Sequence, residues 1–391
     1  MSGSGTAKPC SVSPEDIAWM RRALALARRG CGHTSPNPSV GAVIVRRGKL
    51  LGQGWHREAG QPHAEVEALR DADRRGHRVR GATLYVTLEP CCTHGRTPPC
   101  TDAIVAAGLR RVVVGVADPN PLHAGRGLRQ LRRAGLDVAQ GVLHAECARL
   151  IEPFVHWIVR RTPFVTVKAA MTLDGKIATA CGESKWITGP AARAHAMQLR
   201  RGADAILVGV NTVLADDPAL TVRGPAARVR QVPPAKPLRR IVLDSRARTP
   251  LTARLVSDAQ AAWTTIVVTR AAPARRVAAL RRRVRVLVAP VSAGRVPLRW
   301  LLRRLGADRV THLLVEGGGE VQASFLLERL AHRVAFYYAP KILGGRDARK
   351  AVAGRGVDRL SAALSLQDLE WRRLGEDLFL AARVGPVARH R

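Results

Sequence analysis

Short apolar runs alternate with amphipathic stretches along the first third of the chain. The runs with strand length and strand composition lie at 40–45, 48–56, 82–90 and 111–120. The stretches with apolar residues at helical spacing lie at 14–30, 62–72, 100–109 and 125–138. Pro14 in a first turn and Gly30 at an end are typical helix boundaries. This alternation predicts a layered α/β domain.

A second α/β series fills the remainder of the chain. Its predicted strands are FVTVKAAM, DAILVGV, RRIVLDS, TTIVVT, RVLVA, HLLVEGG and RVAFYYAP. Helical patterns between them include AARAHAMQLRR and VQASFLLERL. Between the two series, the sequence reads as a connecting helix broken by Pro153. We therefore predict a flexible start at 1–13, one domain at 14–145, a connecting segment at 146–162 and a second domain at 163–391.

The net charge of +34 reflects 64 basic against 30 acidic residues. Such an excess is typical of proteins that bind nucleic acids or anionic membranes, but a dedicated binder concentrates its basic residues on one face or arm. Here the arginines are spread over the whole chain and aromatic residues make up only 4%. We therefore expect no specific nucleic-acid partner, although a phosphorylated substrate and cofactor would account for some of the arginines.

The location of the protein is predicted from its cysteines and its hydropathy. The chain has seven cysteines, of which three lie within 91–100, and this is not a disulfide framework. It lacks both an apolar run of about 18 residues and a signal-peptide core, so we expect no membrane span and no export. These features together favour the cytoplasm.

A zinc site is predicted from PHAEVEAL at 62–69 and EPCCTHGRTPPC at 89–100. Zinc deaminases carry His-x-Glu followed by Pro-Cys-x-x-Cys. His63 and Cys91 fit this pattern, and Cys100 is the expected third ligand because a helix starts there after two prolines. Cys92 is expected to be a packed thiol. The alternatives are a purely structural zinc site, or unrelated core thiols and a surface histidine.

Glu65 distinguishes a catalytic zinc site from a structural one. Three protein ligands leave a fourth position for water, whose pKa zinc lowers to about 7. A glutamate beside that position can take the proton of the water and deliver it to a ring nitrogen and a leaving amine. The first domain is therefore predicted to remove an exocyclic amine by hydrolysis, with Glu65 as general acid and base.

The first half of the chain resembles a known enzyme family. TSPNPSVGAVIV, HAEVEAL, TLYVTLEPCCTHGRTPPCTDAIVAAG and ADPNPLHAGRG closely resemble the deaminase domain of the bacterial RibD-type bifunctional deaminase/reductases of riboflavin biosynthesis. The resemblance implies a cytidine-deaminase-like domain acting on a diaminopyrimidinone that bears a ribosylamino 5′-phosphate. It also places Asn37 in the base pocket. His94 and Arg96 become candidates for substrate contact, or they are solvated loop residues.

The second half gives a weaker signal when it is read alone. HLLVEGGGEVQASFL predicts a strand, a glycine turn and a helix, and backbone N–H groups at such a helix start can hold a phosphate. The glycine pattern is not that of a Rossmann site, and a tight turn explains it equally well. KAAMTLDGKIATACGESKWITG, RRGADAILVGVNTVLADDPALTVR and YYAPKILGG, however, resemble the reductase domain of the same family.

That resemblance implies a dihydrofolate-reductase-like fold that uses NADPH to reduce a ribosyl group to ribityl. The cofactor residues that it implies are Ala170, Trp186, Thr212, Asp216, Ser245, Gly318, Gly319, Glu320, Val321, Gln322, Ala323 and Ser324. The implied substrate residues are Ser184, Arg200, Leu220, Arg223 and Glu316. Lys168 is either a proton donor or part of a structural ion pair. The chain departs from the family at Ala331-His332-Arg333, where Val-Asp-Glu is usual, so two acids are replaced by bases. We expect this to alter a local surface pairing, either within the chain or at a subunit contact.

The predicted function is therefore a bifunctional enzyme with one zinc ion and NADPH, small phosphorylated pyrimidine substrates and a homo-oligomeric assembly. A tRNA-editing deaminase is the first alternative, which the charge favours and the long cysteine spacer and second domain oppose. A nucleic-acid-binding protein with a structural zinc knot is the second alternative. Glu65 argues against the second, since a structural site has no use for an acid/base group.

Overall fold

The computed structural model describes residues 13–94, 98–120, 123–222, 237–290 and 294–385. The chain divides into two compact units, Met1–Arg160 and Arg161–Arg391. Both consist of β-sheets with covering helices, which confirms the two-domain α/β fold class. Within the described residues, every helix is too short or too polar to cross a membrane.

The first unit is built on a five-stranded sheet with the order β2-β1-β3-β4-β5. Strand β1 pairs antiparallel with β2 and β3, whereas β3, β4 and β5 run parallel. The strands are β1 (Gly41–Arg46), β2 (Lys49–Trp55), β3 (Thr83–Leu88), β4 (Arg111–Val116) and β5 (Asp137–Gln140). The helices are α1 (Pro14–Ala27), α2 (Ala64–Arg74), α3 (Cys100–Ala106), α4 (Arg126–Arg133), α5 (His144–Leu150) and α6 (Glu152–Arg160).

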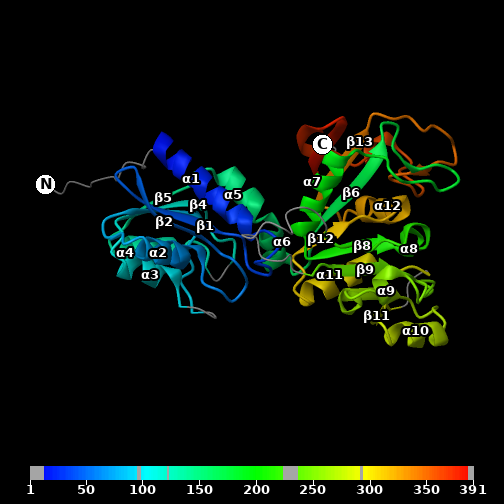
Figure 1. The fold of residues 1–391 in the computed structure, drawn as a ribbon, viewed down its shortest axis with the longest axis horizontal. Coiled ribbons are helices and arrows are strands. Elements are labelled where there is room, and N and C mark those ends of the chain that lie inside the picture. Colours follow the sequence, from blue (N-terminus) through cyan, green and yellow to red (C-terminus); the bar gives the residue numbers. More distant parts are fainter. Residues whose placement is uncertain (1–12, 95–97, 121–122, 223–236, 291–293, 386–391) are drawn as a thin grey trace. The chain divides into compact units, whose positions relative to one another are not determined.

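Helices cover both faces of this sheet, with α1 and α5 on one face and α2, α3 and α4 on the other (Figure 1). The start of α1 is held by a capping box between Ser13 and Asp16. Asp16 is buried and also accepts hydrogen bonds from the Tyr85 hydroxyl and the Arg111 guanidinium. The first helix is thereby tied to β3 and β4 across one face of the sheet.

Residues 146–160 of the predicted connecting segment belong to the first unit, and its last two residues belong to the second. The break between α5 and α6 falls at Ile151, and Pro153 lies in the first turn of α6. A proline is tolerated there because its missing N–H would have no partner within the helix. Cys147 and Ile151 are buried in the two core clusters of the unit. The helices around Pro153 therefore contribute to the core rather than forming a bare linker.

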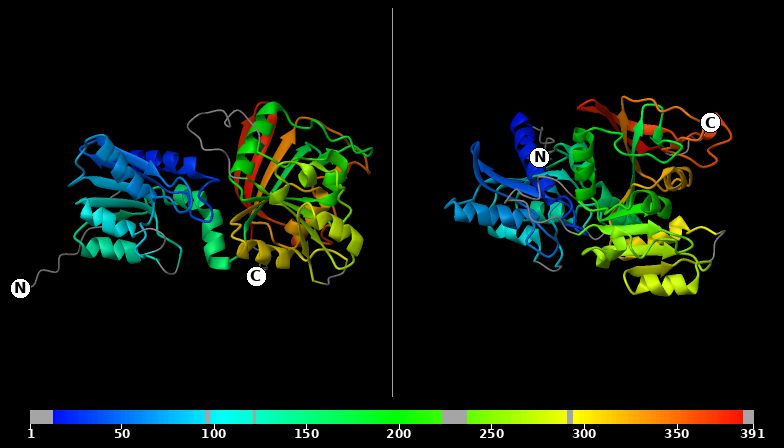
Figure 2. Two further views of the ribbon diagram at one scale, coloured as in Figure 1. Left: turned by 60° about the horizontal axis from the view of Figure 1, so that its bottom comes forward. Right: turned by 45° about the vertical axis from the view of Figure 1, so that its right-hand side comes forward.

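The second unit is built on a nine-stranded sheet with the order β11-β10-β9-β8-β12-β6-β13-β16-β15. The pairings from β11 to β13 are parallel, and β16 pairs antiparallel with β13 and β15. Figure 2 shows the orange and red strands of the C-terminal region beside the green β6. A separate pair is formed by β7 and β14.

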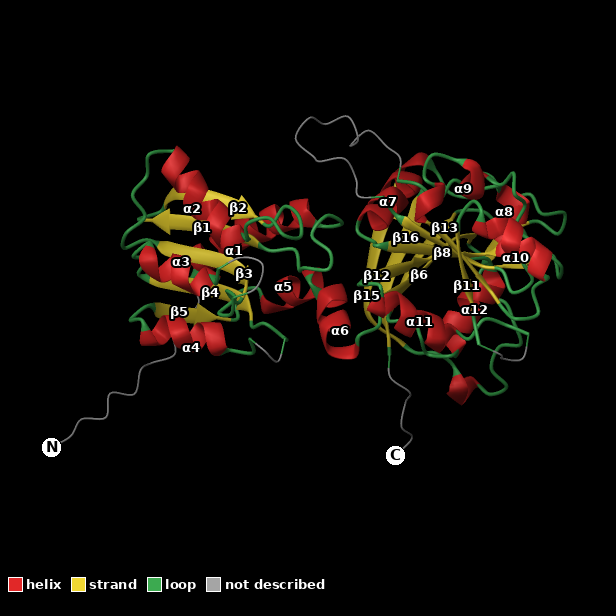
Figure 3. Cartoon of the chain, turned by 90° about the horizontal axis from the view of Figure 1, so that it is seen from below, coloured by secondary structure: helices red, strands yellow, loops and turns green. Residues whose placement is uncertain are grey.

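The strands of the second unit are β6 (Phe164–Thr172), β7 (Lys176–Ala178), β8 (Ala205–Gly209), β9 (Arg239–Leu243), β10 (Thr264–Val268), β11 (Arg285–Val288), β12 (His312–Val315), β13 (Arg333–Ala339), β14 (Arg349–Lys350), β15 (Leu366–Leu374) and β16 (Asp377–Val384). Its helices are α7 (Pro190–Arg201), α8 (Val210–Asp216), α9 (Arg254–Ser257), α10 (Ala274–Arg281), α11 (Leu298–Ala307) and α12 (Gly319–Leu327). Figure 3 shows these helices around the yellow strands of the sheet.

The structure changes the interpretation of Ala331-His332-Arg333. Ala331 is only 5% exposed and belongs to the core of the second unit, so this position is not a surface one. The His332 ring stacks on Phe164, and its Nδ1 accepts the Val165 N–H at 2.9 Å. A neutral histidine thus satisfies a backbone donor of β6, which gives this departure a structural role inside the unit.

Candidate active sites

The metal-binding side chains predicted in the first unit lie together. His63 is the N-cap residue of α2, Cys91 follows the end of β3, and Cys100 is the first residue of α3. Their ligand atoms all lie within 4.8 Å of one another. The His63 Nδ1 is 3.5 Å from the Cys91 sulfur and 3.3 Å from the Cys100 sulfur. Two thiol sulfurs and one imidazole nitrogen are a donor set that suits zinc and leaves a fourth position for water.

The electrostatics of this cluster also suit a cation. A hydrogen bond from Cys100, assisted by His63, lowers the pKa of Cys91 to about 4. The same hydrogen bond raises the pKa of Cys100, because Cys100 is the donor. The two sulfurs therefore share one proton, and a divalent cation between them would displace it because metals bind thiolates.

Glu65 lies in the first turn of α2 and is only 4% exposed. Burial raises the pKa of its carboxyl group, because the charged form loses hydration. The carboxyl group also shares a hydrogen bond with the Cys100 thiol, which places it beside the ligand cluster. A carboxyl group with a raised pKa can both take up and release a proton near neutral pH.

Asn37 is linked to the metal cluster through His56, a residue that the sequence analysis does not single out. The Asn37 Nδ2 is 3.1 Å from His56 Nε2, and His56 Nδ1 is 3.1 Å from the Pro62 carbonyl. The His56 and His63 rings meet edge to face at 5.1 Å. The sequence did contain a signal for this contact. When 40–45 and 48–56 pair as a hairpin, Asn37 before the first strand and His56 at the end of the second come to the same end of the hairpin.

The loop between Cys91 and Cys100 is described in part. The Cys92 sulfur lies 3.8 Å from His123 Nδ1, away from the three clustered ligands, and burial raises its pKa. His94 is exposed. Arg96 falls outside the described residues. The substrate contacts considered for His94 and Arg96 thus stay predictions.

Glu89 is a second residue that the sequence analysis does not single out. It is 3% exposed at the end of β3, and its carboxylate accepts four backbone N–H groups. These donors belong to Asp118, Gly125, Gly127 and Leu128. Glu89 thereby fixes the loop after β4 next to the metal cluster. An acidic residue directly before the Pro-Cys pair was the available signal.

The main charged cluster of the second unit joins β6, α7 and the residue after β12. Arg200 and Glu316 form a bidentate ion pair with both N···O distances at 2.8 Å. The Lys168 Nζ lies 3.6 Å from Glu316 and 5.7 Å from the centre of the Tyr337 ring. Burial raises the pKa of Glu316, but the neighbouring Lys168 and Arg200 outweigh this effect and lower it to about 2. Lys168 therefore does take part in an ion pair.

A second group of predicted residues lies around the end of α8. The Ser184 hydroxyl donates to Asp216 at 3.0 Å. Leu220 is buried nearby with a left-handed backbone, and Arg200 donates to the carbonyl of Thr221 at 3.1 Å. One short segment thus connects predicted cofactor and substrate residues. Arg223 falls outside the described residues.

The remaining predicted cofactor residues are spread over four places. Ala170 is in β6, and Ser245 follows β9. Trp186 is 68% exposed, with the Arg193 guanidinium 4.7 Å from its ring centre. Thr212 lies in α8, facing the glycine turn: a Cβ at Gly318 would be 3.8 Å from its hydroxyl.

The glycine turn before α12 forms a tight cradle. A Cβ at Gly319 would lie 2.1 Å from the Lys350 carbonyl, so only glycine fits. Gln322 is buried and donates to the Gly317 carbonyl, while its Oε1 has no partner among the described residues. A Cβ at Gly318 would meet nothing closer than the Thr212 hydroxyl at 3.8 Å, so the backbone directly before the helix start is open, as a bound phosphate requires.

The other predicted residues of this helix face in different directions. Glu320 accepts the Gly354 N–H, and the Ser324 hydroxyl donates to the Glu320 carbonyl. Ala323 is buried, whereas Val321 packs against the core of the second unit. Gly318, and not the covered Gly319, is therefore the residue of the set whose backbone is best placed to approach a phosphate.

Comparison with known proteins agrees with both halves of the chain. The "Cytidine and deoxycytidylate deaminase zinc-binding region" matches residues 13–116, and the "RibD C-terminal domain" matches residues 163–380. The riboflavin biosynthesis protein RibD of Actinobacillus pleuropneumoniae is 44% identical, covering 93% of this chain and 94% of its own. That of Escherichia coli K12 is 42% identical, covering 94% and 98%.

Solved structures extend this similarity to the fold. RibD of Acinetobacter baumannii (form 1) has a TM-score of 0.82 at 37% identity, covering 95% of this chain and 99% of that one. A Thermotoga maritima deaminase/reductase has a TM-score of 0.80 at 34% identity, with the same coverage. With relatives of this similarity along nearly its whole length, the chain belongs to the RibD family, and it is a bifunctional riboflavin-biosynthesis enzyme that joins a zinc-dependent deaminase to an NADPH-dependent reductase.

Proposed function

We propose that the chain deaminates 2,5-diamino-6-(5-phosphoribosylamino)pyrimidin-4(3H)-one and then reduces 5-amino-6-(5-phosphoribosylamino)uracil to its ribityl form. The Thermotoga maritima relative is described as a diaminohydroxyphosphoribosylaminopyrimidine deaminase and 5-amino-6-(5-phosphoribosylamino)uracil reductase. The observation that carries the proposal is the cluster of His63, Cys91 and Cys100 with buried Glu65 beside it. A zinc knot for binding nucleic acid would not need that carboxyl group.

In the deaminase site, His63, Cys91 and Cys100 would hold zinc, which supplies a water activated at neutral pH. Glu65 would hold the proton of that water and pass it to the ring nitrogen and then to the departing amine, because its pKa is raised by burial. Asn37 would bind the base, and its bond to His56 would fix the orientation of its amide. His94 and Arg96 stay candidates for contact with the substrate.

In the reductase site, NADPH supplies the hydride. We assign its binding to Ala170, Trp186, Thr212, Asp216, Ser245 and the turn and helix start at 318–324. The sugar-phosphate substrate is assigned to Ser184, Arg200, Leu220, Arg223 and Glu316. Three of the five N–H groups of Arg200 already bond to Glu316 and Thr221, so part of its role is to orient Glu316. Lys168, whose Nζ lies 3.6 Å from Glu316, is the candidate proton donor for the opened ribose.

The proposal is tested with purified protein and the diaminopyrimidinone ribosyl phosphate, with products identified by mass spectrometry. Without NADPH, the deaminated ribosylaminouracil phosphate should accumulate together with ammonia. With NADPH, it should be converted to the ribityl product, two hydrogens heavier. Deamination of adenosine or cytidine in RNA, with the pyrimidinone untouched, would instead support the tRNA-editing alternative.

We also propose a cytoplasmic homo-oligomer that associates through the β15–β16 end of the large sheet. Strand β15 ends the sheet in the described residues, and Leu369, Trp371 and Leu378 are 51%, 52% and 41% exposed. An edge strand with exposed apolar side chains is a ready surface for a second copy. Light scattering coupled to size-exclusion chromatography should give a mass above 42.2 kDa. A monomer at micromolar concentration would contradict this proposal.

A further inference from the structure

Arg240 on β9 is the largest fully buried side chain in the part of the chain that the structure describes, and neither site includes it. Its guanidinium carries five N–H donors, and five hydrogen bonds match them. Nε donates to the Thr264 hydroxyl, Nη1 to Asp258 and the Ala219 carbonyl, and Nη2 to Asp258 and the Leu255 carbonyl. The distances run from 2.7 to 3.1 Å.

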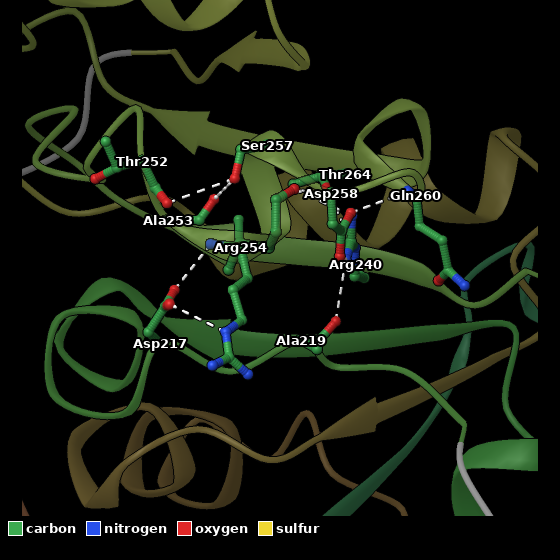
Figure 4. A network of polar contacts seen from close by, with 11 residues as sticks. Asp217, Ala219, Arg240, Thr252, Ala253, Arg254, Ser257, Asp258, Gln260 and Thr264 are labelled. Carbon is green, nitrogen blue, oxygen red and sulfur yellow. Dashed lines mark hydrogen bonds and ion pairs between the residues drawn. The ribbon is translucent and has the colours of Figure 1, made fainter.

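The ion pair with Asp258 makes this burial tolerable. A buried guanidinium is stable only when its charge is paired and its remaining donors are satisfied. Asp258 accepts at 2.7 and 2.8 Å, and Thr264 in turn donates to the Leu255 carbonyl. Figure 4 shows Arg240 between Asp258 and the carbonyl of Ala219. The guanidinium therefore has one fixed position, from which it bonds to a separate segment of the chain.

That segment, 216–221, is held at several points. Asp217 accepts the Arg254 N–H at 2.8 Å, and Ala219 accepts from Arg240 at 3.0 Å (Figure 4). At one end of the segment, the Asp216 carboxylate accepts a hydrogen bond from the Ser184 hydroxyl. At the other end, the Thr221 carbonyl accepts one from Arg200. The same Arg200 guanidinium also donates a hydrogen bond to Glu316.

The backbone of this segment needs such support. Asp217 has φ 39° and Leu220 has φ 49°, both in the left-handed region that is unfavourable for residues other than glycine. Conformations of this kind persist where the surrounding structure fixes them. The Ala219 carbonyl, between these two residues, is the atom that Arg240 holds. Leu220 itself is packed into the core beside Leu255.

We infer that Arg240, fixed by Asp258, is a positioning residue of the reductase: it holds the 216–221 segment so that the Asp216 side chain faces the cofactor and the Leu220 backbone faces the substrate. The inference rests on the proposed function, which assigns those two residues to binding. Arg240 touches neither ligand and acts only through the Ala219 carbonyl. Its loss should therefore weaken binding by the reductase and leave the deaminase unchanged.

The test compares Arg240→Lys with Arg239→Lys in the full chain. Arg239 is the matched control, because it is the next residue of β9 and bonds to the Asp308 carbonyl, away from the segment. Arg240→Lys should raise the Kd for NADPH and the reductase KM about tenfold, since small displacements of binding groups have large effects. Its deaminase kcat/KM should match the wild type. Arg240→Met also loses the charge and should bind NADPH and the substrate more weakly than Arg240→Lys does. Lysine at this position should therefore restore part of the binding.

Hydrogen exchange provides a second measurement that does not depend on activity. Amides at 216–221 should exchange at least tenfold faster in Arg240→Lys than in Arg239→Lys, while β8 and β12 keep their protection. If Arg240→Lys does not fold, Asp258→Asn loosens the same guanidinium and should give the same two results. The inference would be overturned if the folded Arg240→Lys or Asp258→Asn protein has the same Kd for NADPH as Arg239→Lys and the same amide exchange at 216–221.

The outcomes also separate this inference from the proposed function. A wild-type protein that neither binds NADPH nor reduces the uracil substrate would refute the function assigned to the second unit. The exchange at 216–221 would still decide whether Arg240 positions the segment. A variant that melts at a lower temperature but keeps wild-type KM, Kd and segment exchange would show that Arg240 is only a stabilising residue, and the inference would be wrong.

Discussion

At the scale of single residues, three ionisable groups beside His63 need different protonation states within one small volume. The sulfurs of Cys91 and Cys100 must both be thiolates to bind a metal, whereas the Glu65 carboxyl group must be able to exchange a proton. The structure separates these tasks by hydrogen bonding and burial. Cys91 has a lowered pKa because Cys100 donates to it, and Glu65 has a raised pKa because it is buried.

Replacing the carboxyl group should separate metal binding from chemistry. Glu65→Gln keeps the shape of the side chain and all three ligands, so the protein should retain one zinc per chain by elemental analysis. Deamination should fall by roughly 10²–10⁴-fold, the usual contribution of a general acid/base. Glu67→Gln is the control, since Glu67 lies on the same helix but pairs with Arg57 and Arg70. Near-normal turnover by Glu65→Gln would rule out the proposed proton transfer.

The cysteines offer a test of which sulfurs bind zinc. Cys100→Ser should lose both zinc and deamination, because its sulfur faces His63 at 3.3 Å. Cys92→Ser should keep both, because its sulfur faces His123 instead. Metal content after dialysis and the deaminase rate give the answer. If zinc is lost only from Cys92→Ser, then Cys92 and not Cys100 is the third zinc ligand, and our assignment is wrong.

At the scale of elements, the sequence predicts strands rich in β-branched and aromatic residues well and the other strands poorly. All seven apolar runs identified in the second half correspond to strands, namely β6 and β8 to β13. Strand β15 is absent from that prediction, because LQDLEWRRL has no β-branched residue and most of its side chains are exposed. Strand β16 is also absent although half of its side chains are buried, because DLFLAARV has a single β-branched residue. Helix α8 is also absent, since Asp-Asp-Pro dominates its end and reads as a turn.

The same limit applies to the sites. Metal-binding residue types in a known spacing can be read from the sequence, and the structure brings His63, Cys91 and Cys100 together. His56, Glu89 and Arg240 act through contacts with residues 6 to 39 positions away, several of them backbone groups. The sequence marks His56 only through its hairpin and Glu89 only through its place before the Pro-Cys pair, because the contacts of all three residues exist only after the strands have paired.

The ion-pair cluster that joins β6, α7 and β12 should make the stability of the second unit depend on acid pH. The folded pKa of Glu316, about 2, is below its unfolded value of about 4.3, so the ionised form stabilises the fold. That contribution is complete above about pH 4.3 and is lost as the pH falls from there toward 2. Glu316→Gln should therefore lower the melting temperature at pH 7, where it leaves Lys168 and Arg200 unpaired, and reduce the loss of stability between pH 5 and 3.

Thermal unfolding followed by circular dichroism at a series of pH values measures this effect. Glu328→Gln is the control, because it removes the same charge from an exposed side chain outside the cluster of Lys168, Arg200 and Glu316. If Glu316→Gln and Glu328→Gln have the same melting curves at pH 7 and pH 4, the cluster does not stabilise the fold through charge.

At the scale of the whole molecule, the excess of basic residues has no assigned part in either reaction. The net charge of +34 should attract any polyanion, but attraction by dispersed charge is released by salt. Binding of bulk tRNA should therefore be weak at physiological salt and should fall by at least tenfold between 50 and 200 mM salt. Filter binding over this range tests the expectation. Tight binding of one RNA that persists at high salt would point to a nucleic-acid function after all.

The two reactions also divide along the chain. All groups proposed for deamination lie in the first compact unit, and all groups proposed for reduction lie in the second. Each unit has its own hydrophobic core. Hydrolysis of an amine needs no nicotinamide, and hydride transfer needs no zinc. The two activities should therefore fail independently.

The most direct measurement of this independence uses two variants and one product analysis. Glu65→Gln should still oxidise NADPH at the wild-type rate when it is given the already deaminated ribosylaminouracil phosphate. Asp216→Ala, given the diaminopyrimidinone substrate and NADPH, should accumulate that deaminated intermediate and form no ribityl product by mass spectrometry. A folded, zinc-replete Glu65→Gln protein that cannot reduce the deaminated substrate would contradict two separate active sites.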